Sequence, residues 1–451
     1  MTNPLAPSSL LTPLISTATM RGIVGDRARL QRMLVFHVSL LRAQAALGVI
    51  PTLATDKITE VARPERYDLA TLGADAAVTG NVATALARAL TAEVGKTDTE
   101  AARYVQWGAS DQDVIDTALV LELRAAIDAL TSDLNSAIDG FTLLAGRHRR
   151  AAAVARTGLQ HRLPMPFGLK VAGYAAALAR SRERLRRLRK EALVLQFGGA
   201  GGTLASLGEN GLKVSERLAA LLDLPLPEAP WHGHSDRLAE VAAAFAILAG
   251  TCGKIARDIS LMMQPEVAEA WEPVGPGSAE ARRPTAVTAA LSAAALAPAL
   301  LAAIVAGQVQ EHEGALGGWQ AQWQAFPGLL LVTSGALGAI TDIVQGVEVD
   351  VDRMRNNLDL TQGLIMAEAV TAVLAAKIGR ERATQLVEDA SRKAMADKRD
   401  LNSVLAEDSR VTAHMTHGEL ARAFELMSYQ GTSQTFIERI VGSLARSSRR
   451  P

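Results

Sequence analysis

Two neighbouring arginines, Arg282 and Arg283, stand near the end of a polar stretch, VGPGSAEARRPTAV, that spans residues 274–287. Two glycines and Ser278 precede the arginines, and a long stretch without charge follows them. Guanidinium groups beside a hydroxyl and flexible backbone suit a loop that binds an anion. The same composition fits the polar start of a buried helix, so the segment by itself leaves both interpretations open.

A second candidate anion site lies in VARTGLQHRLPMPFGLK, residues 154–170, which we expect to form a loop because of its prolines and glycines. Arg156 supplies a fixed cation, and Thr157 and Gln160 supply hydroxyl and amide donors. His161 ionises near neutral pH, which makes it the first candidate for a proton donor. The alternative is a solvated histidine on the surface.

A third candidate is the start of a strongly periodic helix in YVQWGASDQDVIDTALVLELR, residues 104–124. Ser110 or Asp111 is expected to cap this helix, which leaves Gln112 and its neighbours at a helix N-terminus that can hold a carboxylate. Every helix needs a cap, so an ordinary N-cap is the alternative.

Three other segments carry weaker signals. The glycine-rich residues 197–211 offer backbone amides for a carboxylate but lack the Lys-Ser/Thr of a P-loop. His232 and His234 precede another helix and suit proton transfer or substrate contact, while no third ligand completes a metal site. Glu266 and Glu269 are expected to be solvated charges at a helix end.

Composition excludes several classes of protein. The 451 residues contain 47 Lys plus Arg and 47 Asp plus Glu, a balance that disfavours a nucleic-acid binder or a polybasic membrane anchor. A single cysteine, Cys252, cannot form an internal disulfide, which favours a reducing cytoplasm. The first twenty residues lack the pattern of a secretory signal.

The elements that position these groups are expected to be helices. Apolar residues recur every three or four positions, aromatic residues make up 4%, and strand alternation is rare, so we predict an all-α fold. Segments 284–310 and 326–341 carry no charge, and the apolarity of the first comes mainly from alanine. We therefore expect burial among neighbouring subunits rather than a membrane span. Composition shifts suggest domains at 1–111, 112–355 (a long central helical bundle) and 356–451.

Several of these stretches, in this order, resemble the fumarase/aspartase superfamily and, within it, the bacterial 3-carboxy-cis,cis-muconate cycloisomerases. The stretches include ARYVQWGASDQDVIDTALVLELR, GGAGGTLASLGENG, QEHEGALGGWQAQW and MRNNLDLTQGLIMAEAV. The resemblance implies three mostly helical domains and a cytoplasmic homotetramer in which three subunits build each active site. It also implies that the uncharged helices lie in the shared bundle.

The superfamily has a mobile loop of the form Gly-Ser-Ser-x-Met-Pro-x-Lys-x-Asn-Pro, which is similar to the arginine-bearing stretch at 274–287. The match places Gly277 on the first serine of this pattern, Ser278 on the second, and Arg283 on the lysine that binds a carboxylate. A one-residue gap would place Ser278 on the serine that removes a proton. Gln106 and Gly158 stand where the lyases of the superfamily have histidines, which disfavours a C–N or C–O lyase.

The resemblance implies lactonization of 3-carboxy-cis,cis-muconate in protocatechuate catabolism, without a metal or an organic cofactor. A carboxylate adds to a conjugated double bond, and a general acid then protonates carbon. The alternatives are a 3-sulfomuconate cycloisomerase, an adenylosuccinate-type lyase and an inactive homologue. The acid is expected to be His161 or, second, His232, with Ser278 as a further catalytic candidate, and the polyanionic substrate is expected to contact Ser110, Asp111, Gln112, Arg156, Thr157, Gln160, Arg282 and Arg283.

Overall fold

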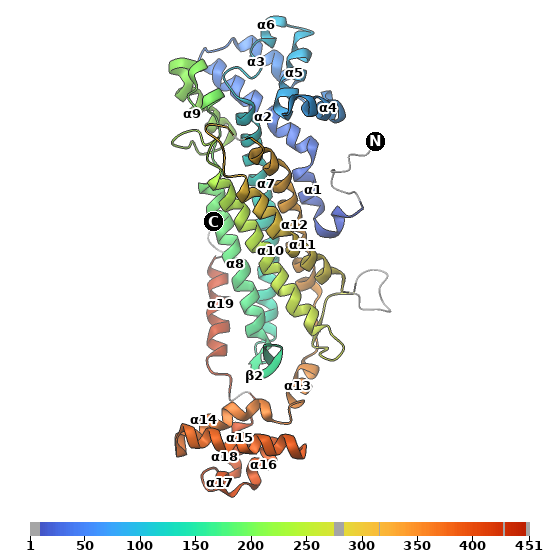
Figure 1. The fold of residues 1–451 in the computed structure, drawn as a ribbon, viewed down its shortest axis with the longest axis vertical. Coiled ribbons are helices and arrows are strands. Elements are labelled where there is room, and N and C mark those ends of the chain that lie inside the picture. The colour runs from blue at the N-terminus through green and yellow to red at the C-terminus, as the bar shows by residue number, and fades with distance from the viewer. Residues whose placement is uncertain (1–9, 275–283, 315, 427–428, 448–451) are drawn as a thin grey trace. The chain divides into compact units, whose positions relative to one another are not determined.

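The fold is described from a computed structural model, which defines residues 10–274, 284–314, 316–426 and 429–447. Figure 1 shows that these residues form helices almost throughout, which confirms the predicted all-α class. The α-helices are α1 (Ala18–Val24), α2 (Asp26–Ala46), α3 (Thr52–Val61), α4 (Leu69–Thr79), α5 (Val82–Gly95), α6 (Thr99–Ala102), α7 (Asp111–Arg147), α8 (Phe167–Glu191), α9 (Gly211–Leu222), α10 (Asp236–Met262), α11 (Thr285–Ala306), α12 (Gly318–Gly346), α13 (Val351–Asp359), α14 (Ala367–Ile378), α15 (Arg380–Asp397), α16 (Leu401–Glu407), α17 (Ser409–Thr412), α18 (His417–Ala423) and α19 (Ser433–Ser447).

Short strands and 3-10 helices complete the described chain. Strand β1 (Ala152–Thr157) pairs antiparallel with β2 (Gln160–Pro166), and β3 (Ala270–Trp271) pairs antiparallel with β4 (Glu348–Val349). The 3-10 helices lie at Thr12–Ile15, Pro64–Arg66, Gly199–Gly201, Ala205–Asn210 and Leu364–Met366.

The chain divides into two compact units, each assembled from three separate stretches. Unit 1 comprises residues 1–134, 181–253 and 289–339, and unit 2 comprises residues 135–180, 254–288 and 340–451.

In unit 1 the long helices α10, α11 and α12 run side by side (Figure 1). Gln322 of α12 donates from Nε2 to the carbonyl oxygen of Ile304 in α11, at 3.1 Å. A Cβ atom on Gly253 of α10 would lie 2.6 Å from the Cβ atom of Ala294 in α11, so these two helices approach closely only because a glycine stands there. Small residues therefore allow the helices of this bundle to pack tightly.

A buried ion-pair cluster joins α2 to α7 in unit 1. The Glu122 side chain is 1% exposed, and its carboxylate lies 3.3 Å from Arg29 and 3.6 Å from Arg32. Two guanidinium groups compensate one buried carboxylate, which satisfies the requirement that a buried charge be paired.

In the part of the chain that the structure describes, three helices are long and apolar enough to cross a membrane by length and composition alone, namely α10, α11 and α12. The most apolar windows of α10 and α12 are 61% and 72% buried within the chain, whereas that of α11 is only 22% buried. Leu296 and Val305 of α11 are nearly half exposed. Within the described residues of one chain, α11 is therefore only partly buried.

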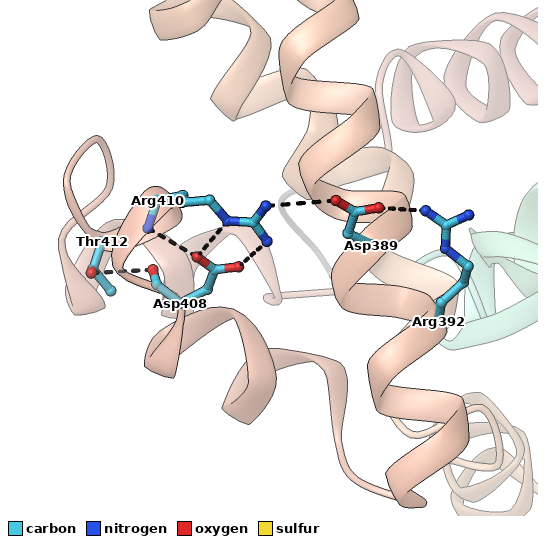
Figure 2. A network of polar contacts seen from close by, with 5 residues as sticks. All are labelled: Asp389, Arg392, Asp408, Arg410 and Thr412. Carbon is cyan, nitrogen blue, oxygen red and sulfur yellow. Dashed lines mark hydrogen bonds and ion pairs between the residues drawn. The ribbon is translucent and has the colours of Figure 1, made fainter.

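In unit 2, helices α14 to α18 enclose a separate apolar core. Val370, Leu374, Leu401 and Leu405 are fully buried in it. Polar contacts lie on the surface of these helices, along α15 and at the start of α17, as Figure 2 shows for Asp389, Arg392, Asp408, Arg410 and Thr412. Arg410 donates from Nη2 to Asp408 at 2.8 Å and lies 3.6 Å from Asp389. Exposed pairs of this kind contribute little to stability, so the apolar core holds these helices together.

Candidate active site

The start of α7 in unit 1 has the cap that its sequence predicts. The backbone N–H of Asp113 donates to Ser110 Oγ at 3.1 Å, and the backbone N–H of Ser110 donates to Asp113 Oδ2 at 2.8 Å. This reciprocal arrangement satisfies two donors that the helix itself cannot satisfy. Ser110 is therefore confirmed as the capping residue, and its hydroxyl oxygen is occupied as an acceptor.

Asp113 also organises the glycine-rich segment of unit 1. Its buried carboxylate accepts the backbone N–H groups of Gly198 and Gly199, each at 2.9 Å, and the side-chain amide of Gln196 at 3.0 Å. Burial raises the pKa of Asp113, and these hydrogen bonds oppose the rise. The expectation that the glycine amides face an external carboxylate is wrong for Gly198 and Gly199, because the carboxylate they bind belongs to Asp113.

Asp111, beside the cap, is held by two side chains of unit 1. It accepts hydrogen bonds from Gln106 Nε2 at 2.7 Å and from the hydroxyl of Thr84. Gln106 has a φ of 57°, a left-handed conformation that is uncommon for a residue other than glycine. Asp111 therefore faces partners of its own chain and adds negative charge beside the helix N-terminus.

His37 of α2 lies buried near this carboxylate. Burial lowers the pKa of His37 to about 4, and the charge of Asp111 opposes that change. Neither ring nitrogen has a hydrogen-bond partner within the described residues. A neutral imidazole is therefore expected at this position at neutral pH.

Gln112 links α7 to the segment that carries His232. Its Nε2 donates to the carbonyl oxygen of His232 at 2.8 Å and to Asp116 Oδ2 at 3.0 Å. Asp116 also accepts the indole N–H of Trp319, at 2.7 Å, and burial raises its pKa to about 7. The structure thus brings Gln112 and His232 together, as two candidate residues from distant parts of the sequence.

The His232 ring packs against a glycine of the glycine-rich segment. A Cβ atom on Gly202 would lie 2.7 Å from His232 Cε1, and Gly202 has a φ of 76°. Both observations require glycine at this position. Both ring nitrogens of His232 are buried and lack hydrogen-bond partners within the described part of the chain.

Residues 154–166 in unit 2 form a hairpin, which corrects the expectation of a loop. Strands β1 and β2 pair from Ala152 with Pro166 to Thr157 with Gln160. Gly158 and Leu159 make the turn with φ values of 56° and 63°, the conformation typical of a tight two-residue hairpin turn. A bulge between Ala155 and Arg156 shifts the register. Thr157 and Gln160 therefore flank the turn.

Arg156 forms a paired contact with a buried carboxylate of unit 2. Its Nη1 and Nη2 donate to the two oxygens of Glu269 at 2.8 and 2.7 Å. Asn357 Nδ2 donates to Glu269 Oε1 at 2.8 Å, and Glu269 is 1% exposed. The expectation that Glu269 is a solvated charge is therefore wrong, whereas Glu266 is exposed as expected. Two N–H groups of Arg156 bind this carboxylate, and three remain.

His161 pairs with Arg156 across the hairpin. The pKa of His161 is lowered mainly by burial and to a smaller extent by the charge of Arg156. The charge of Glu269 opposes this change. The His161 Nδ1 atom is buried and lacks a partner within the described residues. A nearby polyanion would raise the pKa of this imidazole and favour its protonated form.

Glu272 joins the chain just before the arginine-bearing stretch to the last residues of that stretch. Its buried carboxylate accepts the backbone N–H groups of Ala286 and Val287, at 3.1 and 2.9 Å, and so caps α11. The remaining predicted residues, Ser278, Arg282 and Arg283, lie outside the described residues.

The predicted residues thus fall into two groups, each within one unit. Ser110, Asp111, Gln112 and His232 belong to unit 1, and Arg156, Thr157, Gln160 and His161 belong to unit 2. Among the described residues, no three His, Cys, Asp or Glu side chains gather closely enough to hold a metal ion. Each group offers neutral donors and an imidazole, which suit anion binding and proton transfer.

Comparison with known proteins establishes the family. Residues 15–278 match the family described as Lyase, and residues 363–440 match the one described as Adenylosuccinate lyase C-terminus. The chain is 57% identical to a 3-carboxy-cis,cis-muconate cycloisomerase of Bradyrhizobium diazoefficiens, over 98% of this chain and 99% of that protein. The chain belongs to the fumarase/aspartase superfamily.

Two further relatives place it within the superfamily. A 3-carboxy-cis,cis-muconate cycloisomerase of Pseudomonas aeruginosa is 43% identical over 96% of this chain and 95% of that one. The crystal structure of the 3-carboxy-cis,cis-muconate lactonizing enzyme from Pseudomonas putida is 42% identical and has a TM-score of 0.93, covering 98% of this chain and 100% of that one. The predicted resemblance to the cycloisomerase branch of the superfamily is confirmed.

Sequence reasoning missed three carboxylates that organise the two groups: Asp113, Asp116 and Glu269. Asp113 and Asp116 stand three positions apart on a helix face that also buries Val114 and Thr117. Charged residues on a buried helix face signal a polar network, because a buried carboxylate needs partners. Glu269 lies in the short stretch QPEVAEAWEP, which has no helix periodicity that would mark a buried face.

Proposed function

We propose that this protein is a 3-carboxy-cis,cis-muconate cycloisomerase, an isomerase that closes its substrate to the carboxymuconolactone. The observation that carries the proposal is the 57% identity to a cycloisomerase over 98% of the chain. We place the reaction in protocatechuate catabolism and the protein in the cytoplasm.

In the proposed reaction one carboxylate oxygen adds to the conjugated double bond, and electron density moves into another carboxylate to form an enolate-like intermediate. A general acid then delivers a proton to carbon. Fixed donors aimed at the developing charge usually contribute most to such a reaction, and the acid contributes roughly 100- to 10,000-fold. The chemistry needs no metal and no organic cofactor.

We assign the general acid to His161, with His232 as the second candidate. The partnerless nitrogens of both rings support this assignment, because each ring has a free position for a proton or a ligand. Ser278 is the third candidate, from its match to the superfamily serine.

Substrate contacts are proposed for the polar residues of both groups and of the arginine-bearing stretch. Arg156 would use the N–H groups that Glu269 leaves free, while the paired contact with Glu269 fixes the guanidinium plane. Substrate anions are proposed to contact Arg156, Thr157, Arg282 and Arg283, with Ser110, Gln112 and Gln160 as neutral donors. Asp111 completes the proposed substrate-binding residues.

We further propose a homotetramer whose subunits share active sites, with domains at 1–111, 112–355 and 356–451. The exposed apolar residues of α11 support subunit packing, because only 22% of the most apolar window of this helix is buried within its own chain. The start of α7 at Asp111 supports the first boundary.

Ultraviolet absorbance tests the proposed activity directly. Lactonization removes the conjugated diene, so absorbance should fall when the protein meets 3-carboxy-cis,cis-muconate. Because Arg283 stands where the superfamily has lysine, 3-sulfomuconate is the comparison substrate, and the ratio of kcat/KM values identifies the preferred one. An unchanged absorbance on every muconate would favour an inactive homologue.

Substitution tests the assignment of the acid. His161→Ala should lower kcat by roughly 100-fold or more if this imidazole donates the proton. His232→Ala should do so instead if the second candidate is correct. Wild-type turnover in both variants contradicts the assignment.

A further inference from the structure

Asp116 of α7 is a buried carboxylate with one donor on each of its oxygens. It is 2% exposed. The indole N–H of Trp319 donates to Oδ1 at 2.7 Å, and Nε2 of Gln112 donates to Oδ2 at 3.0 Å. Gln112 stands four positions before Asp116 on the same helix, a spacing that brings two side chains onto one face. The carboxylate therefore links the start of α12 to a proposed substrate contact.

The Trp319 ring has little freedom to turn. It is buried, and the ring of Trp323, one helical turn further along α12, meets it edge to face with 4.8 Å between the ring centroids. An indole nitrogen can only donate a hydrogen bond. The Asp116 oxygen on this side must therefore remain an acceptor.

The amide of Gln112 uses both of its N–H groups inside the protein. Nε2 donates to Asp116 Oδ2 at 3.0 Å and to the carbonyl oxygen of His232 at 2.8 Å. Two acceptors around one atom identify it as the amide nitrogen. Oε1 has no hydrogen-bond partner among the described residues, and it is not closed off from solvent, since Gln112 is only partly buried. The group that Gln112 offers to a ligand is thus an acceptor oxygen.

An acceptor oxygen in a site for a polyanion has a restricted choice of partners. It repels a carboxylate, because both oxygens carry negative charge, and it stabilises a neighbouring group that holds a proton. In the proposed reaction the general acid must hold its proton until the carbon atom accepts it. An N–H or O–H group of that acid is therefore the partner that fits Gln112 Oε1.

We propose that Asp116 is a positioning residue for the proton transfer. Together with the carbonyl group of His232, it turns the oxygen of Gln112 outwards, where this oxygen accepts the N–H or O–H group of the general acid. The inference rests on the proposed function and alters one of its contacts, because Gln112 in this orientation has no N–H group left for the substrate. Asp116 acts through Gln112 and does not touch the substrate.

Asp116→Asn removes this control while keeping the size of the side chain. Trp319 holds the asparagine oxygen on its own side, so the new NH2 group faces the NH2 group of Gln112, and the Gln112 amide turns. The turned amide presents N–H groups to the anionic substrate. We expect kcat on 3-carboxy-cis,cis-muconate to fall by at least about tenfold while KM does not rise. Loss of diene absorbance measures both constants at about pH 8, where the Asp116 carboxyl is ionised because its pKa is about 7.

Trp319→Phe in two backgrounds separates positioning from mere packing. In the wild type this change removes a donor from Asp116 and should lower kcat/KM. In the Asp116→Asn variant the same change lets the asparagine turn its oxygen towards Gln112, so kcat/KM should rise by roughly threefold or more. Lost packing alone would lower kcat/KM in both backgrounds. Gln112→Met replaces the pair if melting temperatures show that Asp116→Asn does not fold, and it too should lower kcat without raising KM.

Asp128→Asn is the matched control, because Asp128 lies on the same helix and pairs with Arg189 at the surface, and it should keep the wild-type kcat and KM. A higher KM in Asp116→Asn or Gln112→Met would overturn the proposal, since Gln112 would then donate to the substrate. So would a Trp319→Phe change that lowers kcat/KM in both backgrounds. Unchanged diene absorbance in the wild type would instead overturn the proposed function, and this role with it.

Discussion

Arg156 and Glu269 form a paired ion contact between residues 113 positions apart in the chain, with N–O distances of 2.8 and 2.7 Å. Glu269 is almost fully buried, and Arg156 is partly exposed. This contact attaches the hairpin that carries His161 to the segment before β3. This buried carboxylate therefore helps to hold the hairpin in place, together with the apolar packing of Val154 against Leu358 and Ile365.

Glu269→Gln should destabilise the protein by about 2 kcal/mol, because the amide keeps one acceptor but leaves part of the guanidinium without its partner. We also expect kcat/KM to fall, since Arg156 and His161 would lose their fixed position. Glu368→Gln is the control, because Glu368 pairs with Arg162 at 3.5 Å and both are at least half exposed. Thermal melting and kinetics measure both variants, and equal melting temperatures would contradict the expected role of Glu269.

Asp113→Asn should cost about 2 to 3 kcal/mol of stability, because one carboxylate oxygen becomes an NH2 group that faces N–H donors. The carboxylate accepts the backbone N–H groups of Ser110, Gly198 and Gly199. Asp98→Asn is the matched control, since Asp98 only caps α6 and asparagine caps helices equally well. Thermal or denaturant unfolding should show a large loss for Asp113→Asn only. A similar loss in both variants would mean that the network around Asp113 adds nothing beyond a helix cap.

Gly202→Ala should lower both stability and kcat/KM, because its Cβ atom would lie 2.7 Å from His232 Cε1. The φ of 76° adds a backbone cost of roughly 1 kcal/mol for alanine. Gly201→Ala is a control one residue away, since its Cβ atom would meet nothing within 4 Å and its φ is not in the left-handed region. Melting temperatures and kinetics of the two variants should diverge. Equal melting temperatures and equal kcat/KM values in the two variants would show that displacing the His232 ring affects neither stability nor activity.

Two buried groups of unit 1 should give opposite dependences of stability on pH. Folding lowers the pKa of His37 to about 4, whereas the unfolded chain keeps the ordinary value of about 6.5. As pH drops below about 6.5 the unfolded chain therefore binds a proton first, and the free energy of unfolding falls by up to about 3 kcal/mol. The pKa of Asp116 rises to about 7, so the folded chain keeps a proton that the unfolded chain has released, and stability is lost as pH rises towards 7.

Variants separate these two contributions. The melting temperature of His37→Gln, measured relative to the wild type at the same pH, should increase as pH falls from about 6.5 to about 4. That of Asp116→Asn, measured in the same way, should increase as pH rises over this range. Melting temperatures recorded across this range check both signs. Curves parallel to the wild type would mean that neither group titrates differently in the folded state.

Local patterns determined much of this protein from the sequence by itself. The apolar period of three to four residues predicts the helices, and Ser110 before such a pattern predicts the cap of α7. Gly48 and Pro51 likewise predict the end of α2, which the structure places at Ala46. Such signals are readable because the interactions behind them lie within a few residues.

Only the tertiary structure decided which polar groups meet. Asp113 binds glycines 85 and 86 positions away, and Glu269 binds Arg156 across 113 positions. The sequence around Glu269 indicates solvated charge, yet folding buries that carboxylate against a guanidinium and an amide. A charge is tolerated inside a protein only where distant residues supply its partners, and a local pattern carries no record of those partners.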